Sequence, residues 1–491
     1  MTAGRPSAAH RNRSPVTSPL VGSAEGAGSA RLRLPPAVPG PPLIGNFLQY
    51  RKDHLAVFER GYALFGPVFS LRLGPQRAAV LVGPKYHEFF FSHVDGLLSV
   101  PELYRFTVPM FGEVLNAVED QTVRLSQLAM LRAAFSQRQA ETHYEKIALE
   151  TEAWIDDLGG EGEFEIYEAF SRHVMNIAAA LVAGDALRGR MDEISELFDD
   201  LARGMDFVLP PDLPLPRFRR RDRARRRLFD ILGPIVAGRR HFKQNDMLQT
   251  IIDGDFLTGD LSRADATIAM TLVSVFTGYL TTSAQLCWVL VQLLQNPAYL
   301  ARVTAEIDDV AADGGDLTYD RIKNLPLLDR AIKESLRMFP VMSHYARFTR
   351  NAYVIDGYDI PAGWLTMLCP ALAHRLPGQF ANPDLYDPDR FGPGREEDRR
   401  DRYALIPFGG GTYTCPGAAV GVTEMTCVAA SLLRRFRMEL VEPEVGRDFD
   451  MGIVRPKPPC MVRYRRRHAR AGTWNGAGAA FDATGPACRS G

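Results

Sequence analysis

The feature that most constrains the fold is a long stretch without charge. No charged residue occurs between Asp265 and Arg302, and the apolar run 268–294 is long enough to cross a bilayer. Ser262, with Asp265 three residues later, is a typical helix cap, and an Asn-Pro pair at 296–297 is a typical helix end. The polar residues of the run recur at steps of three or four, which places them on one helix face: Thr267, Thr271, Ser274, Gly278, Thr281 and Gln285. We therefore predict a long helix buried in a core, with a membrane-spanning helix as the alternative.

Composition excludes several classes of protein. The 491 residues are 46% hydrophobic, which suffices for a sizeable core. The 58 basic and 58 acidic residues cancel, which argues against a dedicated nucleic-acid binder. The six cysteines include no Cys-x-x-Cys pair, so neither a zinc site nor a disulfide framework is expected. A reduced, cytoplasmic setting fits best, and no transmembrane anchor is predicted.

The chain divides into three predicted segments. Residues 1–34 are rich in Ser, Ala, Gly, Arg and Pro, and residues 467–491 are Gly/Ala-rich, so both are expected to be disordered. A Pro-rich run opens the body, 35–466, which we expect to be one large domain. Strand patterns near 68–73, 78–82, 352–358 and 364–368 flank a mainly helical region, 121–294. The fold class is therefore predicted as mainly α with a small β region.

The sharpest chemical signal is a glycine-rich loop around one cysteine. Pro407–Gly417 contains Phe-x-x-Gly-x-x-x-Cys-x-Gly, formed by Phe408, Gly411, Cys415 and Gly417, and a helical pattern follows it. A thiolate that ligates iron must stay deprotonated, which a helix N-terminus and backbone N–H groups favour. Glycines let the backbone pass close to the sulfur, and an aromatic ring shields it. The loop predicts a metal-bound thiolate, against the alternative of a buried structural cysteine.

Two weaker patterns accompany this loop. Lys333-Glu334-Ser335-Leu336-Arg337 puts an acid and a base on one helix face, and Pro388-Asp389-Arg390-Phe391 supplies a second arginine. In the long helix, Thr277-Gly278-Tyr279-Leu280-Thr281-Thr282 places a hydroxyl three residues after a glycine. Such a spacing opens the helix ladder locally and directs a hydroxyl into a cavity. Either pattern alone also describes a solvated ion pair or a threonine bonded to its own backbone.

In this order and spacing, the three patterns resemble the cytochrome P-450 superfamily over nearly all of 35–466. The resemblance implies that haem b lies between the long helix and the cysteine loop, with Cys415 as axial ligand and metal-binding residue. It implies a structural ion triad of Glu334, Arg337 and Arg390, and a catalytic hydroxyl on Thr281. It also implies dioxygen as co-substrate, with electrons from NAD(P)H through a ferredoxin and a ferredoxin reductase. A thiolate ligand favours O–O cleavage.

A closer resemblance is to bacterial sterol 14α-demethylases. It rests on the segment 104–113, on the run 216–222 and on the ending 462–467. By this match Tyr104 and Arg347 contact the haem propionates, since phenol and guanidinium groups donate to carboxylates. Phe106 belongs to the segment that recognises substrate in that family.

The chain departs from that family at three places. Tyr279-Leu280 stands where sterol demethylases carry two histidines, and leucine cannot relay a proton. Tyr413 replaces a basic residue two positions before the cysteine, which leaves a phenol as the cofactor contact. Ser343-His344-Tyr345 replaces an apolar pocket segment. Because unpaired polar groups in a buried pocket cost free energy, this segment predicts a substrate more polar than a sterol.

The leading hypothesis from the sequence is a haem-thiolate monooxygenase recruited to tailor a natural product. Three alternatives stay open: a sterol 14α-demethylase with a changed proton path, a non-catalytic haem-binding sensor, and an integral membrane protein built on the uncharged helix. The pocket residues expected under the leading hypothesis are Phe106, Tyr279, Leu280, Ser343, His344 and Tyr345. No nucleic-acid partner is expected.

Overall fold

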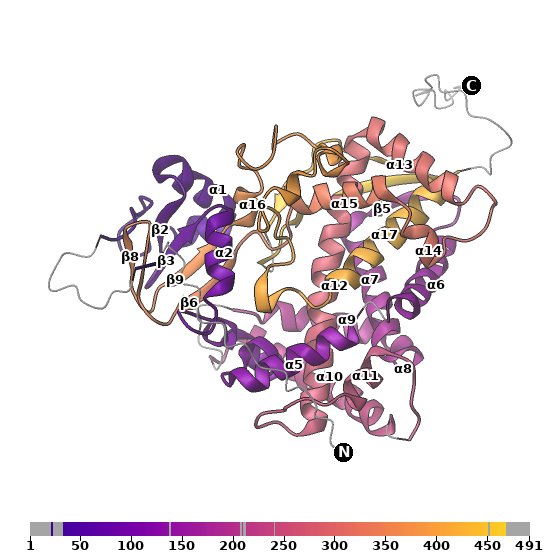
Figure 1. Ribbon diagram of the computed structural model, residues 1–491. Helices are drawn as coiled ribbons and strands as arrows, with labels where there is room; N and C mark the ends of the chain where they lie inside the picture. The colour runs from indigo at the N-terminus through magenta and orange to yellow at the C-terminus, as the bar shows by residue number, and fades with distance from the viewer. Residues whose placement is uncertain are drawn as a thin grey trace, which may run out of the picture.

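A five-stranded sheet forms one side of the molecule and a bundle of helices the other (Figure 1). The computed structural model describes residues 21–22, 33–136, 139–206, 209, 213–239, 241–449 and 452–467. Of the predicted tail 467–491, the residues 468–491 lie outside these residues, as does most of the predicted segment 1–34. Within the latter, β1 (Val21–Gly22) pairs with β7 (Tyr353–Ile355), which the prediction of disorder did not include.

The main sheet has the strand order β2-β3-β9-β6-β4. Strands β3 and β9 are parallel, and the other pairs are antiparallel. The alternating and apolar runs of the sequence form these strands, and a Gly-Pro turn joins the first two. Helices α1 (Phe47–Phe65) and α2 (Pro84–Ser92) flank the sheet. The strand bounds are β2 Val68–Leu73, β3 Gln76–Leu81, β9 Leu365–Leu368, β6 Tyr345–Thr349 and β4 Leu98–Ser99.

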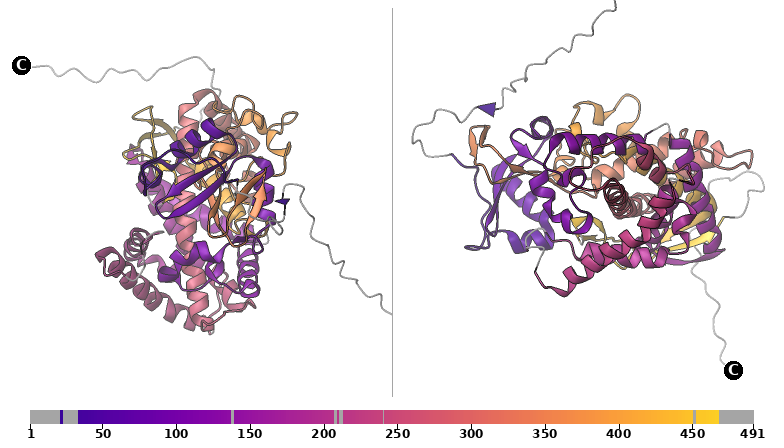
Figure 2. Two further views of the ribbon diagram at one scale, coloured as in Figure 1. Left: turned by 90° about the vertical axis from the view of Figure 1, so that its left-hand side faces the viewer. Right: turned by 90° about the horizontal axis from the view of Figure 1, so that it is seen from below.

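The uncharged stretch forms α12 (Arg263–Gln295), which runs through the middle of the helical region. Ser262 accepts the backbone N–H of Asp265 as N-cap, and Asn296 ends the helix before Pro297 begins the next. Among the described residues, α12 is the one helix long and apolar enough to cross a membrane, and 72% of that apolar window is buried inside the protein. Seen from below, α12 is viewed nearly end-on among the surrounding helices (Figure 2). It is therefore a core helix, as predicted.

The surrounding elements complete the mainly helical fold. Helices α7, α10, α15 and α17 pack directly on α12. The longer helices are α5 Gln121–Ala134, α6 Ala140–Leu158, α7 Ile166–Ala183, α9 Met191–Arg203, α10 Pro216–Gly238, α11 Met247–Asp253, α13 Pro297–Val310, α15 Pro326–Met338 and α17 Ala418–Arg435. The short helices are α3 Pro101–Tyr104, α4 Val108–Phe111, α8 Asp185–Arg188, α14 Tyr319–Ile322 and α16 Pro370–Ala373.

A small sheet holds the last described strand beside the helices. Strand β13 lies between β10 and β5, so the last described strand pairs with one that precedes α7. The bounds are β5 Glu161–Glu165, β8 Tyr358–Ile360, β10 Phe436–Leu440, β11 Arg447–Asp448, β12 Arg455–Pro456 and β13 Met461–Arg466.

Candidate active site

The cysteine loop is closed by its own backbone. The N–H of Cys415 donates to the carbonyl of Phe408 at 3.0 Å. Gly411 has φ +65°, and a Cβ there would lie 2.9 Å from the backbone oxygen of Phe91 in α2, so this position favours glycine. A Cβ on Gly417 would lie 4.0 Å from Cys415 Sγ. The glycines thus let the loop pack closely against α2 and around the sulfur.

The thiol of Cys415 is open on one side. Of the five cysteines among the described residues, it alone is exposed. The protein atoms on its other sides raise the pKa of the thiol, and hydrogen bonds from the backbone N–H groups of Gly417 and Ala418 oppose that rise. Ala418 is the first residue of α17, so the sulfur lies at the positive end of a helix dipole. The two N–H groups and the helix dipole favour a thiolate at this position, whereas burial opposes it.

The middle of α12 comes close to the start of α17. A Cβ placed on Gly421 would lie 3.8 Å from Thr282 Oγ1. Thr277 is exposed although most of α12 around it is buried, so one face of the helix is open at this level. Thr281 Oγ1 donates to the carbonyl of Thr277 at 2.8 Å, which fixes its side chain at the edge of that open face. The predicted catalytic hydroxyl therefore lies on the face that the sequence pattern indicated.

The guanidinium of Arg347 is buried, and no carboxylate pairs with it among the described residues. Its side chain is 5% exposed, Nη1 donates to the carbonyl of Ala346 at 2.7 Å, and Nε has no partner among the described residues. The guanidinium lies over the rings of Phe90 and Tyr413, 5.2 and 5.9 Å from their centroids. Burying an unpaired charge is costly, so this arrangement fits a site that receives a carboxylate from a bound group.

Tyr413 is held by two residues that the sequence patterns did not single out. Its hydroxyl donates to Asp95 Oδ2 at 2.8 Å and accepts from Arg124 Nε at 2.7 Å. Arg124 also pairs with Asp95 Oδ1 at 2.6 Å, and its side chain is 2% exposed. The available signal was an arginine on the face of α5 that also carries Leu128 and Leu131. Asp95 neutralises Arg124, whereas Arg347, over the same Tyr413 ring, has no carboxylate partner among the described residues.

The other predicted contacts lie around the loop. Tyr345 Oη donates to the carbonyls of Ile406 and Pro407 at 3.0 Å, which ties β6 to the cysteine loop. Cys415 and Tyr104 are both close enough to raise the pKa of Tyr345, after burial as the main cause. Tyr104 stacks on Phe106 with ring centroids 6.0 Å apart. These aromatic residues therefore gather on the same side as the thiol.

The ion triad is completely buried. Glu334 receives two hydrogen bonds from Arg337, at 2.7 and 2.9 Å, and one from Arg390 Nε at 3.1 Å. All three side chains are 0% exposed. Arg390 also pairs with Glu397 at 2.9 Å, so the second arginine has its own carboxylate. The triad joins α15 to the segment before the cysteine loop, which is the position predicted from the sequence.

The structure corrects the prediction that the segment 343–345 presents unpaired polar groups to a pocket. Ser343 and His344 do not present unpaired groups to a cavity, because α1 satisfies them. Ser343 Oγ lies 2.5 Å from His54 Nε2 and 3.1 Å from His344 Nδ1, and His344 Nε2 lies 2.6 Å from Tyr50 Oη. The predicted penalty for an apolar substrate required unpaired groups and therefore does not arise here. The argument for a substrate more polar than a sterol loses its basis.

Tyr279 and Leu280, two further predicted pocket residues, do not lie on the open face of α12, and their pocket roles stay a prediction. Tyr279 points to the other side of α12, where its ring packs on Phe198 and Phe276 at centroid distances of 5.8 and 6.0 Å. Leu280 is 5% exposed within the hydrophobic core. The reason is helix phase, since neither position shares the open face of Thr277 and Thr281.

The buried histidines give a pH-dependent stability. Burial lowers the pKa of His54 to about 4. The unfolded chain, with a pKa near ~6.5, then binds more protons than the folded chain, so the free energy of unfolding falls as pH drops from about 6.5 towards 4. We expect His54→Gln, followed by urea unfolding between pH 7 and 5, to reduce this slope by up to about 1.4 kcal/mol per pH unit. His241→Gln, at an exposed histidine, serves as control. An unchanged slope in His54→Gln contradicts the prediction.

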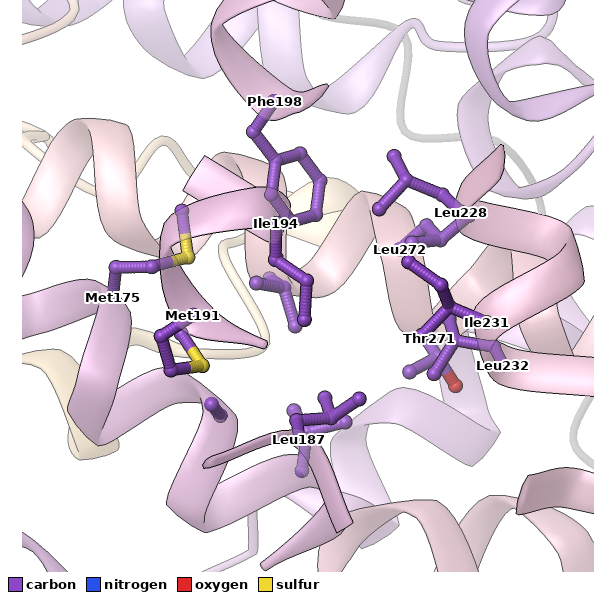
Figure 3. Close-up of a pocket in the computed structure, with 13 residues that line it drawn as sticks. Met175, Leu187, Met191, Ile194, Phe198, Leu228, Ile231, Leu232, Thr271 and Leu272 are labelled. Atoms are coloured by element: carbon purple, nitrogen blue, oxygen red, sulfur yellow. The ribbon is translucent and has the colours of Figure 1, made fainter. Parts of the chain in front are cut away.

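A separate cavity lies on the far side of α12, among α7, α9 and α10 (Figure 3). Its lining is apolar except for Thr271, whose hydroxyl donates to the carbonyl of Thr267 at 2.8 Å. Figure 3 shows side chains such as Met175, Leu187, Ile194 and Phe198 around it. Because its one polar side chain is already paired, the lining offers no free polar group to a ligand.

Comparison with known proteins agrees with the fold and the loop. The cytochrome P450 family model matches residues 35–464, so the chain belongs to the cytochrome P450 family. The cyanobacterial structure described as retinoic acid-bound CYP120A1 superposes with a TM-score of 0.81 at 24% identity, covering 89% of this chain and 100% of that one. This likeness confirms the mainly helical fold.

Within the family, the chain is similar to enzymes that act on sterols. It is 33% identical to sterol 14-demethylase of Arabidopsis thaliana, over 89% of this chain and 93% of that one. It is 32% identical to obtusifoliol 14-alpha demethylase of Sorghum bicolor, with 90% and 92% covered. It is 30% identical to sterol 14alpha-demethylase of Mycolicibacterium vanbaalenii, with 86% and 96% covered. The predicted resemblance to sterol 14α-demethylases is confirmed.

The family assignment makes the chain a monooxygenase that holds haem through a cysteine thiolate and receives electrons from NAD(P)H through a redox partner. The residues present fit such a group. Cys415 would bind the iron through its open thiol. The open face of α12 offers a free face beside it. The unpaired cation of Arg347 would bind a carboxylate of the haem.

Proposed function

We propose that this enzyme removes the 14α-methyl group of a sterol by oxidation. The observation that carries the proposal is the pairing of Ser343 and His344 with α1, which removes the reason for a polar substrate. The similarity to sterol demethylases from plants and bacteria supports it.

The roles of single residues form part of this proposal. Bound haem supplies the activation of dioxygen. Cys415 would hold the iron, Phe408 would shield the sulfur from water, and the loop glycines let the backbone pass close to the sulfur. Arg347 pairs with a haem carboxylate, and Tyr104 and Tyr413 lie beside it. Thr281 holds a proton at the open face of α12.

We further propose that a ferredoxin and its reductase supply the electrons and that the enzyme works in the cytoplasm. The burial of α12 supports this location, because the one described helix that could span a membrane is committed to the core.

One observation favours a second candidate, the oxidation of a natural product. Leu280 and Tyr413 differ from what sterol demethylases carry at these places, and Tyr413 is built into a network with Asp95 and Arg124. A recruited enzyme retains the fold and changes such residues.

A binding and turnover assay separates the two candidates. Purified protein, reconstituted with haem, is mixed with lanosterol-type sterols, and the low-spin to high-spin shift is recorded. We expect a saturable shift and, with a ferredoxin system, a 14α-demethylated product. Sterols that give neither shift nor product, in protein whose reduced carbon monoxide complex has the thiolate spectrum, contradict the sterol proposal and favour the second candidate.

A further inference from the structure

Two buried histidines bind the segment that leads into the cysteine loop. His87 belongs to α2, and His374 directly follows α16. Both are 0% exposed. His87 Nδ1 lies 2.9 Å from the carbonyl oxygen of Tyr403, and the backbone N–H of Ile406 donates to His374 Nε2 at 3.0 Å. The two rings therefore bind the same short segment at positions three residues apart, and each ring uses one nitrogen to do so.

These two hydrogen bonds determine which ring nitrogens carry a hydrogen. A carbonyl oxygen only accepts, so Nδ1 of His87 carries the hydrogen and Nε2 keeps a lone pair. A backbone N–H only donates, so Nε2 of His374 is the acceptor and Nδ1 carries the hydrogen. Burial lowers the pKa of His87 to about 4 and that of His374 well below its usual value, so both rings are neutral at pH 7. One acceptor and one donor therefore remain for a further bond.

The two remaining nitrogens are buried without a partner. No hydrogen bond reaches His87 Nε2 or His374 Nδ1 among the described residues. The rings are also close neighbours. After burial, His87 is the largest cause that lowers the pKa of His374, ahead of Arg337, whose Nη1 donates to the His374 carbonyl at 2.9 Å. Unpaired buried polar groups are rare, because no bond offsets the free energy of their desolvation. Two of them beside each other indicate a bound molecule.

A water molecule fits this pair of groups, because it donates to the free acceptor and accepts from the free donor at the same time. A metal ion does not fit, since it needs a lone pair from both rings and Nδ1 of His374 carries a hydrogen. We propose that His87 and His374 bind a water molecule between them, and that this bridge positions the segment 403–407 and, through it, Cys415. The positioning part rests on the proposed role of Cys415 as the ligand of the iron.

The bridge connects elements that already support the cysteine loop. Phe91, one turn after His87 on α2, stacks on Tyr403 with ring centroids 5.8 Å apart. The backbone of Phe91 also passes so close to the loop that a Cβ on Gly411 would lie 2.9 Å from its carbonyl oxygen. On the other side, the carbonyl of His374 accepts a hydrogen bond from the ion triad. The water would therefore link α2 and the triad at the segment that continues into the loop.

A high-resolution crystal structure of the protein tests the water site. We expect a water within about 2.7–3.2 Å of both His87 Nε2 and His374 Nδ1 in the wild type, and none in His87→Asn or His374→Gln. Asparagine retains a donor for the Tyr403 carbonyl and glutamine an acceptor for the Ile406 N–H, so these variants remove only the second ring nitrogen. An empty site in the wild type, or a direct bond between the two rings, overturns the proposal. This result needs no variant to fold.

Urea unfolding of the single and double variants tests whether the two histidines act through one bridge. Each of His87→Asn and His374→Gln leaves the other ring nitrogen unpaired, so we expect each to raise the unfolding equilibrium constant about tenfold or more. The double variant should be no less stable than the worse single variant, because no unpaired partner remains. The matched control is His93→Asn, at a half-buried histidine whose Nδ1 also binds a carbonyl of α2, and its effect should multiply with that of His374→Gln. Effects that multiply for His87 and His374 contradict the bridge.

The thiolate spectrum tests the positioning of Cys415. The red-shifted carbon monoxide band of the reduced, haem-loaded protein is followed as urea is raised, beside the helical signal in circular dichroism. We expect the two signals to disappear together in the wild type. In His87→Asn and His374→Gln, the band should disappear at a lower urea concentration than the helical signal, because the loop loosens before the rest of the fold. Coincident loss in both variants overturns the positioning role. The water site and the unfolding result do not depend on the iron ligand, so the two proposals fail separately.

Discussion

Cys415→Ser is expected to abolish both the haem-thiolate spectrum and the monooxygenase activity. Cys415 is the exposed cysteine among the described residues, and its sulfur lies at the N-terminus of α17. A serine hydroxyl stays protonated at neutral pH and cannot donate electron density as a thiolate does. Loss of a group that only orients a metal ligand lowers metal affinity or activity by roughly 10–100-fold. We therefore expect loss of the ligand itself to lower product formation by more than about 100-fold.

The carbon monoxide difference spectrum of the reduced protein measures this result directly. Wild-type protein should show the red-shifted Soret band of a thiolate ligand, and Cys415→Ser should lack it. Cys427→Ala is the matched control, since Cys427 lies on the following helix, is buried and is expected to serve packing alone. A red-shifted band that persists in Cys415→Ser, or that disappears in Cys427→Ala, would transfer the ligand role to another residue.

The second large effect is expected from Glu334→Gln. This change leaves Arg337 and Arg390 buried without the carboxylate that joins them. Breaking a buried ion pair by removing one partner costs about 3–5 kcal/mol, because the remaining charge is uncompensated. Urea unfolding should therefore show a midpoint far below that of the wild type, and haem retention should fall with it, since the triad supports the segment before the cysteine loop.

A surface pair from the same region provides the control. Arg302 pairs with Asp389 at 2.7 Å, next in sequence to Arg390, but the two side chains are 48% and 41% exposed. Exposed pairs contribute about 0–1 kcal/mol, so Arg302→Gln should change the free energy of unfolding little. If Glu334→Gln and Arg302→Gln lowered the free energy of unfolding equally, burial would not be the reason why the triad stabilises the fold.

Local patterns predicted the long helix and the loop well. The run 268–294 with its cap and stop became Arg263–Gln295 with Ser262 as N-cap, and the helix after Cys415 begins at Ala418. These features depend on residues within a few positions of one another, because caps, helix phase and glycine turns are satisfied by neighbours in the chain.

The direction of side chains in the pocket could not be predicted in this way. Ser343 was expected to line the pocket, but its partner His54 lies 289 residues away on α1. The partners of the Tyr413 hydroxyl, Asp95 and Arg124, lie 318 and 289 residues away. Whether a polar group counts as unpaired depends on such distant partners, and no local pattern contains them.

The sequence by itself determined the family, the thiolate loop and the polar face of α12, because each is written in a short spacing of residue types. Only the tertiary structure decided which polar groups are free. It paired Ser343 and His344 with α1, committed Arg124 to Asp95, and left Arg347, His87 and His374 with unpaired buried atoms. The physical reason is that a buried polar group must find a partner or pay for its desolvation, and the packing of distant elements determines which groups do.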